Sequence, residues 1–446
     1  MNIQTFYKSS FLASLADGMI SPFLSIFALS LGATKMIIGL LSSLPTLASL
    51  LSQVLWAALT ETMKKKSWMI ILGGVLWSLL WIPIAFVHDP IQLIFLIAIQ
   101  SFLSAMTTPA WTSFLIMLIP SYKRGEINAD INTIAAIASF IGTMISGFLL
   151  NKFGFVYGIF FAVCFLGLMS RIPFLFTQEP KTPVYSRGIV SAIKNTFSIF
   201  NIKREKKLVN LMKAIIFLNF AVTISGPFFS IHVIQNIGGT NMDIAIITAL
   251  GVISTIIFYK PWGMLIDYLG RKVIMLSCII PVSFLPFVYA FAPNIQWLYV
   301  YSIIANMSWG GFNLAAFAYL SDIIPKERTS SFISFYNLLT GLSSVIGPFV
   351  GGIIADYTNL PFIFILSTFL RLCSIYFVDA LEEKSGIRPA GVFKFGFVPL
   401  DLLSYRIESF VFTYSLVMRE ATLNGMKLLK VKKQVKNLID SIKSLK

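Results

Sequence analysis

Charged side chains are scarce in this sequence, and their scarcity excludes a soluble protein. Only 12% of the 446 residues are charged, 57% are hydrophobic, and the mean hydropathy is +0.81. A soluble chain of this length would have too few polar side chains to cover its surface. We therefore expect the protein to lie in a lipid bilayer.

Cysteines are few, and the motifs of common enzymes are absent. Cys164, Cys278 and Cys373 each fall inside a hydrophobic segment without CxxC spacing, so we expect neither a disulfide nor a metal site. The sequence contains no HExxH or GxGD motif and no GxxxxGKS or GxxxxGKT loop. These absences favour a protein that is not an enzyme and that needs no cofactor.

Long hydrophobic segments are abundant instead. About 20 apolar residues suffice for a helix to cross roughly 30 Å of hydrocarbon. The sequence therefore predicts an all-α polytopic membrane protein with twelve transmembrane helices. They are expected near residues 8–31, 36–59, 67–87, 91–119, 128–150, 154–176, 208–234, 242–263, 272–293, 295–320, 329–355 and 358–380.

The basic residues, which give a net charge of +16, are unevenly placed. The N-terminus and the even-numbered connections carry seventeen Lys and Arg, whereas the odd-numbered connections carry two. Basic loops stay on the cytoplasmic side of a membrane. The pattern predicts a multi-pass protein of the cell membrane with both termini in the cytoplasm, and it accounts for the charge without nucleic-acid binding.

Several stretches occur twice at a nearly constant offset. PFLSI at 22–26 matches PFFSI at 227–231, which lies 205 residues later. GMLIDYLGRK at 263–272 matches AALTETMKKK, which lies 206 residues earlier. Pro120 and Pro325 are again 205 residues apart, each in a proline-basic turn. We infer that the chain contains two copies of one six-helix unit.

This repeat divides the chain into four predicted parts. They are a first six-helix bundle at 1–176, a cytoplasmic linker at 177–207, a second bundle at 208–381 and a basic tail at 382–446. The tail carries an apolar stripe opposite lysines, which predicts an amphipathic helix on the cytoplasmic leaflet. A helix that binds a partner or a partly disordered tail is the alternative.

The stretch GMLIDYLGRK resembles the GxLxDxxGRK signature of the major facilitator superfamily (MFS), and the resemblance extends over about residues 5–381. It implies two halves that rock about a central site and expose it to each side in turn. It also implies a cytoplasmic latch, with glycines for close packing and a tight turn. The alternative is a plain loop salt bridge. The latch residues are Gly263, Asp267, Gly270, Arg271, Lys272, Asp322 and Arg328.

Asp17 is the one acid that falls deep within a predicted span. A bare carboxylate near the bilayer centre costs at least about 2.5 kcal/mol, so it should face a cavity, pair with a base or hold a proton. The family resemblance implies that the first helix lines the central cavity. We therefore predict a proton-coupling role for Asp17, with a hydrogen-bonded acid that stabilises a helix contact as the alternative.

Polar residues in the helices that should line the cavity are candidates for substrate binding. Asn306, Trp309 and Asn313 are spaced by three and four residues, which places them on one helical face. Packing between helices is the alternative explanation. The predicted substrate-binding residues are Gln100, Asn219, Asn306, Trp309, Asn313 and Asn337.

Two further features have two interpretations each. Arg371, deep in the last predicted helix, could bind an anionic group or serve packing or lipid contact. The stretch GLSSVIGPFVGG at 341–352 is similar to a helix motif of MFS antiporters, but it also suits close packing of helices through small residues.

Together these features favour a secondary transporter that exports small amphipathic molecules by alternating access. We expect it to be coupled to protons, to contact membrane lipids and to work as a monomer. Two alternatives stay open. One is a symporter that takes up a nutrient such as a sugar or an organic acid, and the other is a transporter-like sensor or lipid-handling protein that does not pump.

Overall fold

The computed structural model describes residues 4–63, 65–119, 124–177, 206–323 and 329–382. Every regular element in these ranges is a helix, as the sequence predicted. Eleven segments are long and apolar enough to cross a membrane. The twelfth, α16 (Ile295–Ile323), is 29 residues long and is not among these eleven. The predicted tail and nearly all of the predicted linker lie outside the described residues.

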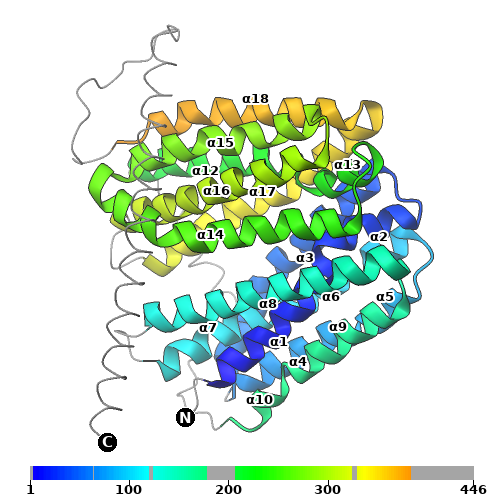
Figure 1. The fold of residues 1–446 in the computed structure, drawn as a ribbon. Coiled ribbons are helices and arrows are strands. Elements are labelled where there is room, and N and C mark those ends of the chain that lie inside the picture. Colours follow the sequence, from blue (N-terminus) through cyan, green and yellow to red (C-terminus); the bar gives the residue numbers. More distant parts are fainter. Residues whose placement is uncertain (1–3, 64, 120–123, 178–205, 324–328, 383–446) are drawn as a thin grey trace, which may run out of the picture.

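Six helical paths form each half of the molecule, and the halves occupy the lower and upper parts of Figure 1. The N-terminal half contains α1 (Gln4–Ile20), η1 (Ser21–Phe23), α2 (Leu24–Ser30), α3 (Lys35–Thr62), α4 (Ser67–Leu79), α5 (Trp81–Ala85), α6 (Pro90–Ser104), α7 (Thr107–Leu118), α8 (Arg124–Phe153), α9 (Tyr157–Met169) and α10 (Ile172–Leu175).

The C-terminal half repeats this arrangement. It contains α12 (Lys206–Thr223), η4 (Gly226–Phe228), α13 (Phe229–Gln235), α14 (Asn241–Leu269), α15 (Arg271–Phe291), α16, α17 (Thr329–Tyr357) and α18 (Leu360–Asp379).

The duplicated stretches PFLSI and PFFSI interrupt the first path of each half. A 3₁₀ turn begins at Ser21 in one half and at Gly226 in the other, 205 residues later (226 − 21). The proline that follows each of these residues cannot donate a backbone hydrogen bond to the preceding turn. Ser230 Oγ in the second stretch donates to Pro22 O in the first at 3.4 Å. The repeat therefore brings two helix breaks together between the halves.

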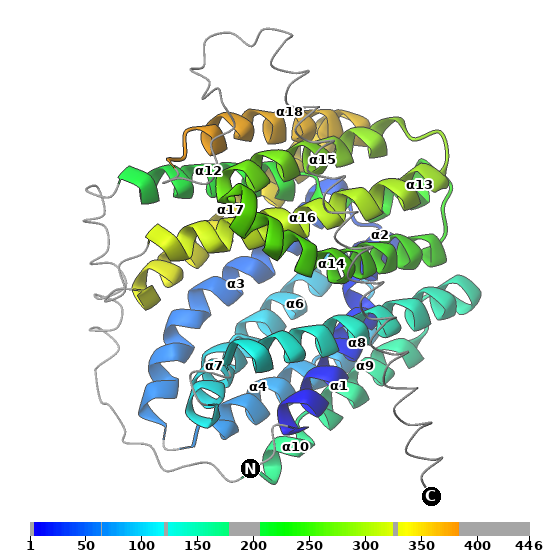
Figure 2. The ribbon, with the colours of Figure 1, turned by 60° about the vertical axis from the view of Figure 1, so that its left-hand side comes forward.

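The buried cores show where the halves are joined. The largest cluster of buried apolar side chains contains residues of both halves, whereas each of two smaller clusters belongs to one half. The shared cluster lies at the end where α2 and α13 lie, which we call the closed end. The separate clusters lie at the opposite end, which we call the open end. Figure 2 shows the two groups of helices converging toward the closed end.

Glycines allow the two halves to approach at the closed end. A Cβ atom added at Gly39 on α3 would lie 2.3 Å from Pro348 O and 3.0 Å from Gly352 Cα on α17. One added at Gly147 on α8 would lie 2.4 Å from Ala245 Cβ on α14. Real side-chain atoms do not come so near, so glycine at both positions permits this close approach of the helices. Small residues therefore define two seams between the halves, α3–α17 and α8–α14.

Candidate functional site

A cavity of about 840 Å³ lies between α8 of the N-terminal half and α14 and α16 of the C-terminal half. Its wall mixes carboxamide, hydroxyl and aliphatic groups, and no acid or lysine or arginine is among the lining residues. Such a wall suits an uncharged ligand with both apolar and hydrogen-bonding groups. The lining residues are Asn128, Ala129, Asn132, Thr133, Ala136, Ile247, Thr248, Gly251, Val252, Thr255, Ile256, Tyr259 and Asn306.

Asn306 reaches this cavity from behind α14 because Gly251 leaves room for it. A Cβ atom at position 251 would lie 2.6 Å from Asn306 Nδ2. Nδ2 donates to Ser302 O at 2.9 Å, and Thr255 Oγ1 donates to Asn306 O at 3.1 Å. These bonds fix the backbone and one side of the amide. The described residues donate no hydrogen bond to the amide oxygen, which leaves it for a ligand at the cavity wall.

The other residues that the sequence nominated for substrate binding lie elsewhere. Trp309 stacks on Phe312 of its own helix, with ring centroids 5.8 Å apart. Gln100 is buried and donates to Trp77 O at 2.9 Å, so it ties α6 to α4. Asn219 donates to Ile215 O one turn earlier in α12. Asn313 and Asn337 are exposed and are not among the residues that line the cavity.

Several cavity residues were not singled out from the sequence. Asn128 and Asn132 stand four residues apart on α8, and Thr248, Thr255 and Tyr259 follow at spacings of seven and four on α14. Both sets therefore form one-sided polar stripes on apolar helices. That periodicity is the signal that could have identified them.

Asp17 lies at the centre of the first path, with thirteen residues on either side in the 27-residue span Gln4–Ser30. The helix that carries Asp17, α1, packs closely against α8 on either side of this residue. Cβ atoms added at Gly18 and Gly142 would lie 2.3 Å from Ser139 O and 2.2 Å from Leu15 O. Asp17 itself is exposed in the structure, whereas its neighbours Ala16 and Gly18 are buried. Within the described part of the chain it has no ion-pair partner.

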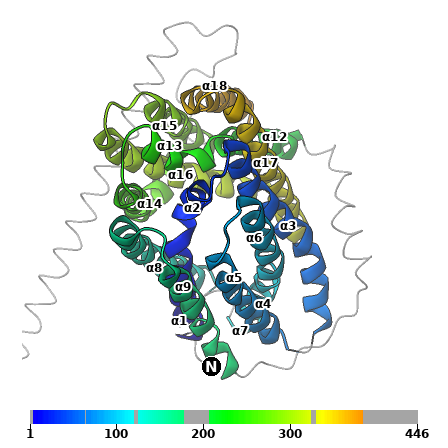
Figure 3. The same ribbon diagram turned by 90° about the vertical axis from the view of Figure 1, so that its right-hand side faces the viewer.

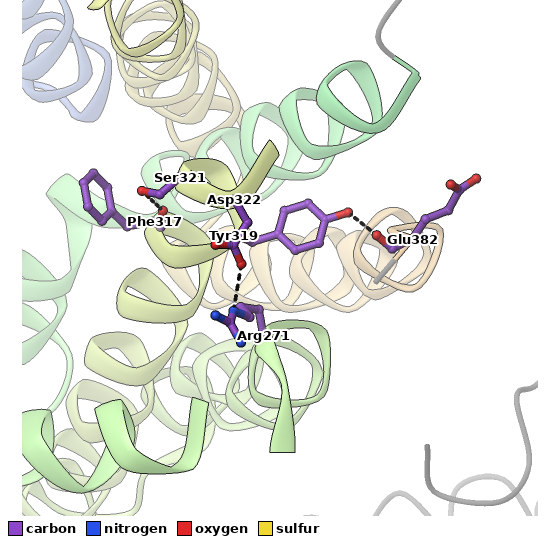
Figure 4. Close-up of polar contacts among 6 residues, drawn as sticks. All are labelled: Arg271, Phe317, Tyr319, Ser321, Asp322 and Glu382. Atoms are coloured by element: carbon purple, nitrogen blue, oxygen red, sulfur yellow. Dashed lines mark hydrogen bonds and ion pairs between the residues drawn. The ribbon is translucent and has the colours of Figure 1, made fainter. Parts of the chain in front are cut away.

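The predicted latch residues form contacts within the C-terminal half at its open end. Figure 4 shows Arg271 Nε at 3.0 Å from Asp322 Oδ2, a contact that joins the start of α15 to the end of α16. Lys272 Nζ lies 3.5 Å from Asp379 Oδ1 at the end of α18. These side chains are partly exposed, so each pair contributes little to stability. Arg328 and the Asp267 side chain lie outside what the structure describes.

The two signature glycines differ in their surroundings. Gly270 has φ of +94° between α14 and α15, a conformation that glycine adopts without strain, as the sequence predicted. Among the described side chains, a Cβ atom at Gly263 would meet Leu314 alone, at 3.9 Å, which is an ordinary contact. Close helix packing therefore does not require a glycine at position 263.

Arg371 on α18 is buried among neutral hydrogen-bond acceptors. Nη1 donates to Val282 O at 2.8 Å, and Nε donates to Ser367 Oγ at 3.1 Å. Nη2 donates to Ser225 Oγ at 3.1 Å and to Val222 O at 3.3 Å. Pro281 and Pro286 interrupt α15 around the first of these carbonyls. The guanidinium thus serves packing within this half, one of the two roles that the sequence left open.

Two six-helix halves, joined at one end with a cavity of mixed polar and apolar lining between them, define a membrane-transport fold. The chain belongs to the MFS_1 like family, whose sequence profile matches residues 2–366. The resemblance found in the GMLIDYLGRK stretch is thereby confirmed.

Curated relatives carry the names of efflux pumps. The multi-drug resistance efflux pump PmrA of Streptococcus pneumoniae is 28% identical over 207 residues, which are 44% of this chain and 51% of that protein. The chain thus spans about half the length of this relative. A PmrA homolog of Lactococcus lactis is 24% identical over 359 residues, which cover 78% of this chain and 87% of that protein.

Solved structures share the fold. The nucleoside transporter NupG has a TM-score of 0.70 at 16% identity, and the match covers 85% of this chain and 99% of that one. A bacterial homolog of the human lysosomal transporter Spinster, solved in an inward-facing and unoccupied conformation, has a TM-score of 0.61 at 13% identity. This match covers 93% of this chain and 97% of that one.

Proposed function

We propose that this protein exports small, uncharged amphipathic molecules in exchange for protons. The observation that carries the proposal is the cavity of about 840 Å³, because its walls come from both halves of the molecule. A ligand held there contacts α8 on one side and α14 on the other. Relative movement of the halves would then change the side of the membrane to which the ligand is exposed.

The open end of the molecule carries the N-terminus of the described chain and basic residues such as Lys8, Arg271 and Lys272. Basic residues favour the cytoplasmic side. We therefore assign the open end to the cytoplasm, so that the conformation described faces inward. The names of the relatives favour export over nutrient uptake. The absence of basic side chains from the cavity wall also disfavours an organic acid as cargo.

Asp17 is proposed as the proton-coupling residue. Its central depth and its lack of an ion-pair partner among the described residues make a permanent charge costly. Its exposure would nevertheless let protons reach it. We propose that the protein works as a monomer among membrane lipids and that Asp17 gains and loses a proton once in each transport cycle.

The test uses purified protein in liposomes with an acidic lumen. An antiporter should accumulate chloramphenicol, an uncharged molecule with an aromatic ring, an amide and two hydroxyl groups, inside these vesicles. Asp17→Asn should still bind the compound, measured by thermal stabilisation, but should lose accumulation driven by the pH gradient. Asp130→Asn is the matched control, since this acid is exposed and accepts a hydrogen bond from Tyr7 at the open end.

Other outcomes would contradict the proposal in different ways. Accumulation only when the external side is acidic would identify a symporter. A panel of compounds that stabilise the protein without crossing the membrane under either gradient would identify a sensor. Equal gradient-driven transport by the wild type and Asp17→Asn would remove Asp17 from the coupling mechanism.

A further inference from the structure

The two seams at the closed end are copies of each other at the level of packing. Gly39 contacts Gly352 across the α3–α17 seam, and Gly147 contacts Ala245 across the α8–α14 seam. Ala245 follows Gly39 by 206 residues (245 − 39), and Gly352 follows Gly147 by 205 (352 − 147). Figure 3, viewed from the closed end, shows α3 beside α17 and α8 beside α14. Gly39 and Ala245 are therefore equivalent positions of the two copies, and so are Gly147 and Gly352. The same two positions of the six-helix unit meet in both seams.

The α3–α17 seam also contains a reciprocal set of hydrogen bonds between the halves. Asp356 Oδ1 and Oδ2 accept from the backbone nitrogens of Lys35 and Met36 at 3.0 and 3.1 Å. Lys35 Nζ in turn donates to the carbonyl oxygens of Ala355 and Thr358 at 2.9 and 3.4 Å. We call these contacts the Lys35–Asp356 clamp.

Each side chain of the clamp caps a helix that belongs to the opposite half. The first backbone N–H groups of α3 and the last carbonyl groups of α17 have no partners inside their own helices. A carboxylate is stabilised at a helix N-terminus and an ammonium group at a C-terminus. Separation of the halves at this end would therefore expose both helix termini at the same time.

The α8–α14 seam satisfies its helix terminus within one half. Thr240 and Asp243 form a capping box at the start of α14, in which each side chain accepts from the backbone nitrogen of the other residue. These bonds stay intact when the halves part. The two seams are therefore alike in packing but different in polar contacts.

We propose that the Lys35–Asp356 clamp is the gate that holds the closed end shut and that must open before the cavity can face that side. The inference rests on the alternating access of the proposed function. Its residues position the halves and do not touch the cargo. The gate belongs to one seam, so opening this end breaks the charged contacts between α3 and α17, together with the neutral hydrogen bond from Ser230 to Pro22 O.

A cysteine at position 43 would report opening of this seam. Ser43 is buried, and it follows Gly39 by four residues and precedes Leu50 by seven on α3. Gly39 and Leu50 both contact α17, so Ser43 lies on the same face of the helix. Serine and cysteine have nearly the same shape. Replacement of the three native cysteines by serine would make Ser43→Cys the single reactive thiol.

The experiment measures how fast a membrane-impermeant maleimide labels this thiol in intact cells. Lys35→Met and Asp356→Ala should each speed labelling by about five-fold, the effect expected when one helix cap is lost. Asp89→Asn is the matched control, because Asp89 caps α6 within a single half at the same end. This control should label at the wild-type rate.

The exchange of the two charges gives the sharpest test. In the double variant Lys35→Asp with Asp356→Lys, each charge sits at the end of its own helix and favours that helix without crossing the seam. We therefore expect labelling as fast as in the single variants. An ordinary ion pair would instead be restored by the exchange, and slow labelling would follow.

Two results would overturn the clamp as a gate. The first is slow labelling in the charge-exchange variant, and the second is wild-type labelling in both single variants when their thermal unfolding shows that they are folded. Labelling needs no cargo and no pH gradient. A protein that fails to transport chloramphenicol can therefore still reveal a working gate, and failure of the gate leaves the liposome result unaffected.

Discussion

At the scale of single residues, Arg371 shows how a membrane protein can bury a cation beside helix breaks. The carbonyl group of Val282 stands four residues before Pro286, which has no N–H to donate, and Val222 lies in the last turn of α12. The guanidinium donates to both carbonyl groups and so replaces the missing backbone donors. Its fork reaches α12, α15 and α18 at once, which a lysine cannot do.

Replacement of Arg371 should therefore destabilise the C-terminal half. Val222 O keeps a hydrogen bond from Ser225 Oγ, whereas Val282 O loses its side-chain donor. A buried carbonyl left without a donor costs about 1–3 kcal/mol, so Arg371→Met should lower the free energy of unfolding by at least about 1 kcal/mol. Arg371→Lys should recover only part of this loss. Thermal unfolding in detergent measures both. Lys213→Met is the control, since Lys213 on α12 is exposed, and a melting temperature for Arg371→Met equal to that of the wild type would refute the role.

At the scale of helices, α14 uses small residues in two different ways. Gly251 leaves space for the Asn306 amide at the cavity wall, whereas Gly263 has only an ordinary contact with Leu314. A methyl group at position 251 must displace Asn306, because 2.6 Å is too short for a contact between heavy atoms that are not bonded. On this helix, a substitution by alanine should therefore disturb the structure at position 251 but not at position 263.

Gly251→Ala should weaken binding of an uncharged amide by about ten-fold, the equivalent of one lost hydrogen bond of about 1.4 kcal/mol. Gly263→Ala should bind as the wild type does. Equilibrium binding of radiolabelled chloramphenicol to the purified variants measures the difference. Equal affinities for the two variants would mean that Asn306 does not contribute to the site.

At the scale of the whole molecule, the structure is one of two arrangements of the same halves. The shared core and both seams lie at the closed end, while the cavity opens between α8 and α14. Transport requires that the seams separate and the open end closes. A covalent tie across one seam should therefore stop the cycle without blocking the cavity.

Cysteines at positions 147 and 245 would provide this tie. A Cβ atom at Gly147 would lie 2.4 Å from Ala245 Cβ across the α8–α14 seam. The two helices must therefore move apart by about 1 Å to reach the separation of Cβ atoms that a disulfide needs. Oxidation of Gly147→Cys with Ala245→Cys should abolish transport, leave binding intact and be reversed by dithiothreitol. Each single variant is a control. Transport that persists after complete cross-linking would show that this seam does not open.

The sequence by itself determined the class of fold. Hydrophobic length, the positions of the basic residues and the 205-residue repeat depend on local composition, and all can be read without knowledge of contacts. The GMLIDYLGRK stretch identified the family for the same reason, because its turn is formed by neighbouring residues such as Gly270. Asp17 was located by hydropathy alone, since one acid in a span is a local anomaly.

The tertiary structure alone decided how the site is assembled. The spacing of polar residues within one helix does not reveal which helices share a cavity. Gln100, chosen as a polar residue in a helix expected to line the cavity, ties two helices together instead. The joining of Asn132 and Asn306 depends on how the halves meet. Lys35 and Asp356 are 321 residues apart and lie in different halves. Each caps a helix of the other half, so this contact depends on how the halves pack.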